Sequence, residues 1–229
     1  MEIKIIKNKN IKIDEVKMNC DAKIKNLEPP LQSYGFFYSI IGPPASGKTN
    51  LLLNMITTKG KMYYKKFDRI EFWSPSRNTI AKKIKLPDER FHDQLDFDEL
   101  EEIIKTLTPD KNNLFIFDDC ISSIKKNCDI FLKLIYNRRH LHISIILVSQ
   151  VYNKIPAEIR KCASSIYFFK NHNKKEMDTI WEDFISISRD DFKFICNTVF
   201  KHAHDFLLID TITDKYYSNF DEIQITHSK

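Results

Sequence analysis

Residues 36–50 read FFYSIIGPPASGKTN, and this stretch decides the fold. An apolar run that favours a strand leads into a loop, and a segment that favours a helix follows. The loop holds two of the chain's 4 glycines, Gly42 and Gly47, and then Lys48 and Thr49. These residues fit the pattern G-x-x-x-x-G-K-[ST]. We therefore predict a phosphate-binding loop.

The residue types in this loop suit a nucleoside triphosphate. Phosphate oxygens need several converging backbone N–H donors, and glycine permits both the tight wrap and the close approach. The helix that follows directs its N-terminal donors and its dipole at the anion. We expect Lys48 to reach the β- and γ-phosphates of ATP and Thr49 to ligate Mg²⁺. The predicted nucleotide-binding residues are Gly42, Pro43, Pro44, Ala45, Ser46, Gly47, Lys48, Thr49 and Asn50.

A second apolar run, LFIFDD at 114–119, ends in two aspartates. One carboxylate at the end of a buried strand can hold Mg²⁺, and the next can polarise the attacking water. We assign Asp118 to the metal and Asp119 to the general base. Two ordinary loop aspartates after a core strand are the alternative.

A third apolar run, ISIILVSQ at 143–150, ends in a glutamine. The side chain of Gln150 can sense the γ-phosphate or orient the attacking water. A surface glutamine at a strand exit is the alternative.

Two adjacent arginines, Arg138 and Arg139, lie at the end of a predicted helix, just before that strand. A planar, delocalised cation suits the charge that develops during phosphoryl transfer, which predicts an arginine finger that reaches a neighbouring subunit's site. Helix capping or surface charge is the alternative. Arg160 is a second candidate. We expect every candidate residue to lie at a strand end or in a loop that can reach the carboxyl edge of the sheet.

Apolar strands alternate with amphipathic helices along the chain, which predicts an α/β fold with a mostly parallel sheet and helices on both faces. The predicted strands are 36–41, 68–74, 114–119, 143–150 and 164–169, with a closing hairpin at 205–210 and 214–220. The predicted helices are 49–56, 97–107, 128–140, 173–184 and 188–199. Strand 68–74 intervenes between the phosphate loop and the acidic strand. We therefore predict the class of P-loop NTPases that carries an additional strand between these motifs.

The composition, 42% hydrophobic and 29% charged, is that of a globular protein, and we predict an extension at 1–30 and a P-loop ATPase domain at 31–229. We expect neither a signal peptide nor a transmembrane segment. The net charge of +5 is compatible with a polyanionic partner. Basic clusters occur at 59–66, 81–85 and 170–175. The first, with its aromatic neighbours, is a candidate contact with a DNA backbone, and a solvated face is the alternative for each cluster.

The five cysteines show no metal-binding spacing and are expected to be free thiols. Two histidine pairs, His140 with His142 and His202 with His204, are expected to have packing or surface roles.

Four segments carry a resemblance to a known family. FFYSIIGPPASGKTNLL, LFIFDD, RRHLHISIILVSQ and IPAEIRKCASSIYFF occur in this order. Together they resemble the FtsK/HerA-type genome-packaging ATPases of large DNA viruses, which include poxvirus, giant-virus and virophage proteins. The resemblance covers roughly residues 34–210.

The resemblance implies a RecA-like core, a homo-oligomeric ring, and ATP hydrolysis coupled to translocation of double-stranded DNA into a capsid. It also implies capsid or portal-vertex proteins as partners, and a location in the host cytoplasm (the viral factory) or the virion. The roles that it gives to Lys48, Thr49, Asp118, Asp119 and Gln150 are those argued above, with Arg138 or Arg139 as the finger.

Two other functions use the same phosphate loop. A nucleotide or nucleoside kinase needs a lid with arginines that close on the phosphates, and the sequence shows no such segment. A nucleotide-switched interaction module needs no catalytic groups, so Asp119 and Gln150 argue against it.

Overall fold

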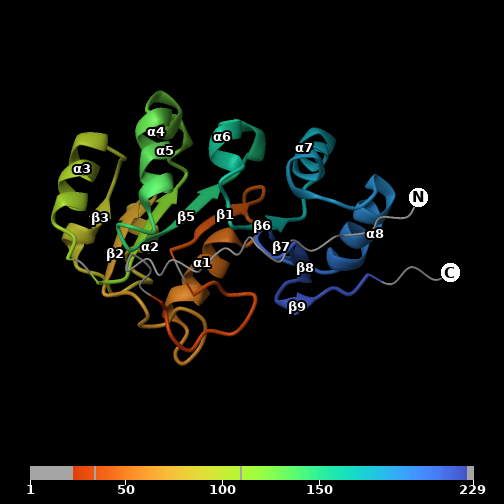
Figure 1. The fold of residues 1–229 in the computed structure, drawn as a ribbon, viewed down its shortest axis with the longest axis horizontal. Helices are drawn as coiled ribbons and strands as arrows, with labels where there is room; N and C mark the ends of the chain where they lie inside the picture. The colour runs from red at the N-terminus through yellow and green to blue at the C-terminus, as the bar shows by residue number, and fades with distance from the viewer. Residues whose placement is uncertain (1–22, 34, 109, 226–229) are drawn as a thin grey trace, which may run out of the picture.

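The computed structural model describes residues 23–33, 35–108 and 110–225 (Figure 1). Within them one sheet has nine strands in the order β3-β2-β4-β5-β1-β6-β7-β8-β9. The strands are β1 (Phe37–Ile41), β2 (Arg69–Trp73), β3 (Phe91–His92), β4 (Asn113–Asp118), β5 (Ile143–Ser149), β6 (Ser165–Phe169), β7 (Phe206–Asp210), β8 (Lys215–Ser218) and β9 (Asp221–Glu222). Pairs among β1 to β6 are parallel, and those from β6 to β9 are antiparallel. The predicted mostly parallel sheet and its closing hairpin are confirmed.

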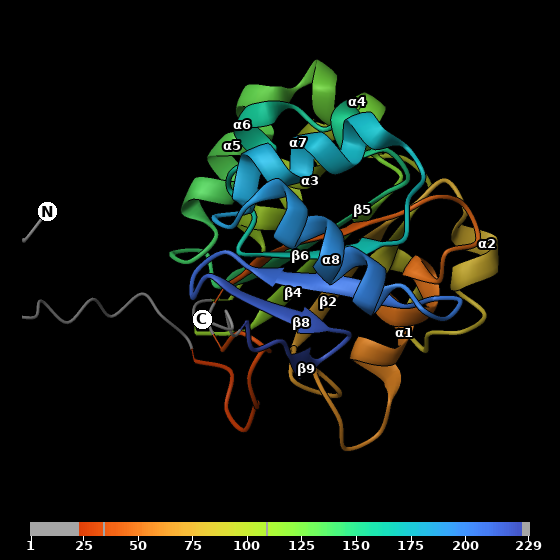
Figure 2. The ribbon, with the colours of Figure 1, turned by 90° about the vertical axis from the view of Figure 1, so that its right-hand side faces the viewer.

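Helices cover both faces of the sheet. The helices are α1 (Lys48–Thr57), α2 (Arg77–Ile80), α3 (Phe97–Lys105), α4 (Ile121–Lys126), α5 (Cys128–Asn137), α6 (Ala157–Arg160), α7 (Lys174–Phe184) and α8 (Arg189–Val199), with 3-10 turns η1 (Asp88–Arg90) and η2 (Tyr152–Lys154). Helices α3 to α8 lie on one face, and α1 and α2 on the other (Figures 1 and 2). The short α2, α4 and α6 were not predicted, because four to six residues carry too little periodicity.

Side chains of the central strands alternate between two apolar clusters, one on each face. In β1, Phe37 and Ile41 pack with the cluster under α3 to α8, whereas Tyr38 and Ile40 pack with the cluster under α1. All these residues are fully buried. A parallel strand covered on both faces reads as a continuous apolar run, which explains why the runs in the sequence predicted the strands well.

The additional strand is present, but it is not the one that the sequence order suggested. Strand β5 lies between β1 and β4, and β2 lies on the far side of β4. The order of strands along the chain does not fix their order in the sheet, because crossovers skip positions. The loops that follow β1 and β4 therefore flank the end of β5.

The segment before β1 packs on the domain. Ile24 is buried in the cluster under α1, and the side chain of Gln32 donates to the Ser164 carbonyl and to Ser165 Oγ, both at 2.9 Å. Residues 1–22 of the predicted extension lie outside the described residues. The boundary at residue 30 stays a prediction. In the part of the chain that the structure describes, no helix combines the length and apolarity that a membrane crossing needs.

Candidate nucleotide-binding and hydrolysis site

The loop between β1 and α1 is shaped by close contacts that only glycine allows. Gly47 has φ of 108°, a conformation that L side chains rarely adopt. A Cβ on Gly42 would lie 2.6 Å from Phe169 Cβ and 2.7 Å from Ser46 Oγ. The Gly42 N–H donates to the Ser149 carbonyl at 3.3 Å, which holds the start of the loop against the end of β5. The predicted strand–loop–helix geometry is therefore present.

The side chain of Lys48 folds back over this loop. Its Nζ donates to the carbonyls of Gly42 and Pro43, both at 2.8 Å. Burial lowers the pKa of Lys48, and the nearby Asp119 and Asp118 oppose that shift. Two neutral carbonyls are weaker acceptors than phosphate oxygens, so the ammonium group can exchange these partners for an anion.

Two further side chains fit a bound Mg²⁺–triphosphate. Ser46 Oγ is buried and has no hydrogen-bond partner among the described residues, so a phosphate oxygen in the loop would satisfy it. Thr49 lies in the first turn of α1 and is exposed. Its hydroxyl and the carboxylate of Asp118 are oxygen ligands of the kind that Mg²⁺ prefers.

The acidic strand end has two different environments. Asp118 is only 8% exposed, and its Oδ2 accepts a hydrogen bond from Ser74 Oγ at 2.9 Å. Burial raises the pKa of Asp118 to about 6, although the hydrogen bond from Ser74 opposes the shift. Asp119 is exposed, and its Oδ2 accepts from Gln150 Nε2 at 2.8 Å. The two residues predicted to act on the attacking water are thus brought together.

Two residues of the site were missed by the sequence reasoning. Ser74 follows β2, next to β4 in the sheet, and the polar end of the predicted strand 68–74 was the available signal. His204, in the loop before β7, places Nδ1 3.0 Å from the Ser46 carbonyl. Nothing local in the sequence indicated this contact, because His204 reaches the loop only through the pairing of β6 with β7.

The expectation that the adjacent arginines can reach the carboxyl edge of their own sheet is wrong. Arg138 Nε donates to the Gly35 carbonyl at 3.2 Å, and the Ile143 N–H donates to the Arg138 carbonyl at 2.8 Å. Both contacts lie where β1 and β5 begin, which places Arg138 and its neighbour Arg139 at the amino edge. At roughly 3.3 Å per residue, the length of β1 separates them from the phosphate loop by about 20 Å.

Part of the alternative role predicted for these arginines is present. Arg138 Nη1 donates to the Ile135 carbonyl at 2.8 Å, which caps the end of α5. Arg160, the second candidate, forms an ion pair with Asp183 at 3.0 Å and lies over the ring of Tyr152. Its guanidinium is therefore held within the packing around α6 and α7.

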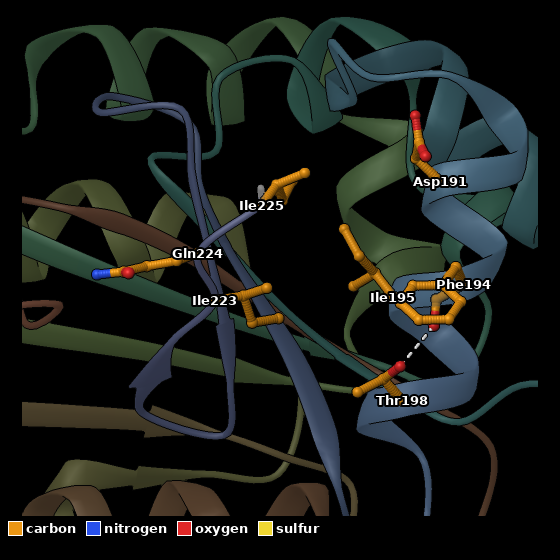
Figure 3. A pocket seen from close by; sticks show the side chains of 7 residues that line it. All are labelled: Asp191, Phe194, Ile195, Thr198, Ile223, Gln224 and Ile225. Atoms are coloured by element: carbon orange, nitrogen blue, oxygen red, sulfur yellow. Dashed lines mark hydrogen bonds between the residues drawn. The ribbon is translucent and has the colours of Figure 1, made fainter. Parts of the chain in front are cut away.

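A cavity of about 490 Å³ adjoins the exposed part of the site, and its walls include Asp119, Gln150, Lys125 and Lys154. A separate hollow of about 340 Å³ lies between α8 and the segment after β9 (Figure 3). Figure 3 shows side chains of α8 on one side and Ile223 to Ile225 on the other. That hollow contains none of the predicted site residues.

A model of a known protein family matches most of the chain. The family model described as "Poxvirus A32 protein" matches residues 27–219, a span that includes the phosphate loop, the acidic strand end and β5. No curated protein gives a match.

Several solved structures share the fold. The genome-packaging NTPase B204 of Sulfolobus turreted icosahedral virus 2 with sulfate has a TM-score of 0.64 and 15% identity, covering 84% of this chain and 98% of that chain. The same protein with ATP-gammaS has a TM-score of 0.61 and 14% identity, covering 90% and 100%. EccC of Thermomonospora curvata (ATPases 2 and 3) has a TM-score of 0.53 and 13% identity, covering 85% and 39%. At these identities the likeness shows the fold, and it confirms the predicted P-loop NTPase class.

The positive φ of Gly47 gives a test of the loop. In Gly47→Ala, the new Cβ would lie 3.1 Å from His204 Nδ1 in a backbone conformation that alanine resists. We expect ATP binding to weaken about tenfold to a hundredfold, which is the equivalent of roughly 1–3 kcal/mol of strain. Isothermal titration calorimetry measures the affinity.

Gly60→Ala is the matched control. Gly60 also has a positive φ, 73°, but a Cβ there meets nothing within 4 Å. We expect a loss of about 1 kcal/mol in the free energy of unfolding and unchanged ATP affinity. Equal ATP affinity in Gly47→Ala and Gly60→Ala would contradict the assignment of the loop.

The raised pKa of Asp118 predicts a gain in stability when its charge is removed. The pKa rises from 3.8 to about 6 on folding, so the carboxyl group contributes stability at low pH that is lost as the pH rises through about 6. We expect Asp118→Asn to raise the free energy of unfolding at neutral pH by about 1–3 kcal/mol, and to abolish ATP hydrolysis. Urea unfolding at several pH values measures the gain, which should shrink toward zero near pH 4. A gain that does not change with pH would show that ionisation is not its cause.

Proposed function

The chain belongs to the poxvirus A32 protein family, and on that premise we propose that this genome-packaging ATPase hydrolyses Mg²⁺–ATP at the carboxyl edge of its sheet to translocate double-stranded DNA. The observation that carries the proposal is the meeting of three strand ends. Lys48 begins the helix after β1, and the hydrogen-bonded pair of Asp119 and Gln150 follows β4 and β5.

In the binding step, the triphosphate lies on the backbone N–H groups of the loop and the first turn of α1. Lys48 exchanges the carbonyls of Gly42 and Pro43 for the β- and γ-phosphate oxygens. Thr49 and Asp118 would hold Mg²⁺, which would neutralise charge on the β- and γ-phosphates. The loop and the first turn of α1 therefore supply the backbone N–H donors and the ammonium group of Lys48 to the triphosphate.

In the hydrolysis step, a water oxygen bonds to the γ-phosphorus while the bond from that phosphorus to the β–γ bridging oxygen breaks. Asp119 accepts the water proton, and Gln150, which donates to Asp119 Oδ2, holds the carboxylate in place and orients the water. The products are ADP and inorganic phosphate.

The position of the arginines supports a ring. Arg138 and Arg139 lie about 20 Å from the phosphate loop of their own chain, so a finger role requires a second subunit. A head-to-tail ring joins two different surfaces of each subunit, and in the ring that we propose the amino edge of one subunit faces the carboxyl edge of the next. The cavity beside Asp119 and Gln150 lies at the carboxyl edge, and in the proposed ring it would receive the neighbour's guanidinium.

Two basic clusters that are separate in the sequence meet in the fold. Lys65 from the cluster at 59–66 and Lys83 and Lys85 from the cluster at 81–85 line one cavity of about 480 Å³. Convergent lysines suit the phosphates of a DNA backbone, and contacts of this kind depend on salt and not on sequence.

The proposal includes capsid or portal-vertex proteins as partners, and the host cytoplasm or the virion as the place of packaging.

Stimulation by DNA tests the proposed motor. We expect linear double-stranded DNA to raise the rate of ATP hydrolysis several-fold, and added salt to remove the stimulation as it weakens backbone contacts. The rate is measured as phosphate release, with Lys48→Ala as the inactive control. A rate that DNA does not change at low salt would contradict translocation.

Mixing two inactive variants tests the finger. Lys48→Ala subunits retain the arginines, and Arg139→Ala or Arg138→Ala subunits retain the phosphate loop. If the finger acts between subunits, a mixture of Lys48→Ala with the variant that lacks the finger recovers part of the wild-type rate, because some interfaces combine an intact site with an intact finger. A mixture that stays inactive, in both pairings, would contradict a finger supplied by the neighbour.

A further inference from the structure

The cavity of about 490 Å³ beside Asp119 and Gln150 carries two lysines that the proposed hydrolysis does not use. Lys125 comes from the last turn of α4 and Lys154 from η2, and both residues are exposed. Among the residues that the structure describes, neither lysine forms an ion pair or a side-chain hydrogen bond, although Asp119 lines the same cavity. Two lysines against one aspartate leave the cavity with a net positive charge.

The cavity lies on the far side of Asp119 and Gln150 from the phosphate loop. Among its described lining residues, none belongs to the loop at 42–49. Helix α1, which follows the loop, covers one face of the sheet, whereas α4 lies on the other (Figure 1). The charge of Asp119 also acts on Lys48, where it opposes the burial that lowers the pKa of that group. Asp119 and Gln150 therefore stand between the loop and the cavity.

In the proposed hydrolysis, inorganic phosphate would leave on the side from which water attacks. The attacking and leaving oxygens of a phosphoryl transfer lie roughly in line, on opposite sides of the γ-phosphorus. ADP and the loop would close the side of the leaving oxygen. The path past Asp119 and Gln150 is the other one, and it leads into the cavity.

The charges along this path suit an anion. Asp119 would accept the proton of the attacking water, so its negative charge would be neutralised as the phosphate forms. Ammonium groups donate short, strong hydrogen bonds to phosphate oxygens. An anion would also lie between the two lysines and the guanidinium that the proposed ring brings to the same cavity, which reduces the repulsion among these cations.

We infer that Lys125 and Lys154 form a product site for inorganic phosphate, through which it leaves while ADP remains on the loop. The inference rests on the function proposed above. Because the neighbour's guanidinium would enter the same cavity, the release of phosphate would change the contact between subunits.

The test measures the affinity of inorganic phosphate for the whole chain saturated with Mg²⁺–ADP, by isothermal titration calorimetry. Lys125→Gln and Lys154→Gln each remove one charge and keep most of the length of the side chain. We expect each to weaken phosphate binding about tenfold, because a charge-assisted hydrogen bond is lost, and to leave the affinity for ADP unchanged. The inhibition constant of phosphate in steady-state ATP hydrolysis should rise by the same factor.

Lys126→Gln is the matched control. Lys126 is the neighbouring exposed lysine in the last turn of α4, and it does not line the cavity. The substitution makes the same change in net charge at the same helix end, so it should keep the wild-type affinity for phosphate.

A phosphate affinity that Lys125→Gln and Lys154→Gln leave unchanged would overturn the inference, including the case in which these variants lose affinity for double-stranded DNA instead. An equal loss in Lys126→Gln would also overturn it, because the effect would then come from overall charge. Each of these results leaves the proposed function standing, provided that wild-type protein hydrolyses ATP and Lys48→Ala does not. Wild-type protein that hydrolyses no ATP in the presence of DNA would overturn the proposed function and this inference together.

Discussion

The site depends on hydrogen bonds between the loops and the end of β5. The Gly42 N–H donates to the Ser149 carbonyl at 3.3 Å, and the Asp119 N–H donates to the Val148 carbonyl at 3.1 Å. Each bond continues a parallel ladder by one residue beyond the neighbouring strand, β1 or β4. Because β5 is central and buried on both faces, the phosphate loop, the acidic pair and Gln150 are held at one level of the sheet. The chemistry that we propose needs that common level.

The same edge contains buried charged groups, and burying charge lowers the stability of a fold. Asp118 and Lys48 are each 8% exposed. Burial raises the pKa of Asp118 and lowers the pKa of Lys48, so it favours the neutral form of each group. Ser74 and the nearby Lys48 partly compensate the carboxylate, and two backbone carbonyls with the nearby Asp119 and Asp118 partly compensate the ammonium group. In the function that we propose, a bound Mg²⁺–triphosphate would add further counter-charges, so the site would be arranged for its ligand at the expense of stability.

Much of the fold and of the site could be predicted from the sequence because its signals are local. The apolar runs of β1, β4 and β5 are continuous, and the loop pattern at Gly42 to Thr49 specifies its own geometry. Two features were not predicted because they depend on pairing between segments that are distant in the sequence. The position of β5 between β1 and β4 follows from crossovers, and the contact of His204 with Ser46 follows from antiparallel pairing of β7. The placement of the arginines failed for a different reason. Arg138 precedes β5 along the chain, which puts it at the amino end of that strand, whereas the site lies at the carboxyl end.

The most direct measurement is a crystal structure of the protein with Mg²⁺ and a non-hydrolysable ATP analogue. The account predicts the phosphates on the loop from Gly42 to Thr49, with Lys48 Nζ released from the carbonyls of Gly42 and Pro43 and bound to the γ-phosphate. Asp118 should lie in the coordination sphere of Mg²⁺, directly or through water. A nucleotide bound away from this loop, or Lys48 still held by its two carbonyls with the nucleotide in place, would contradict the account.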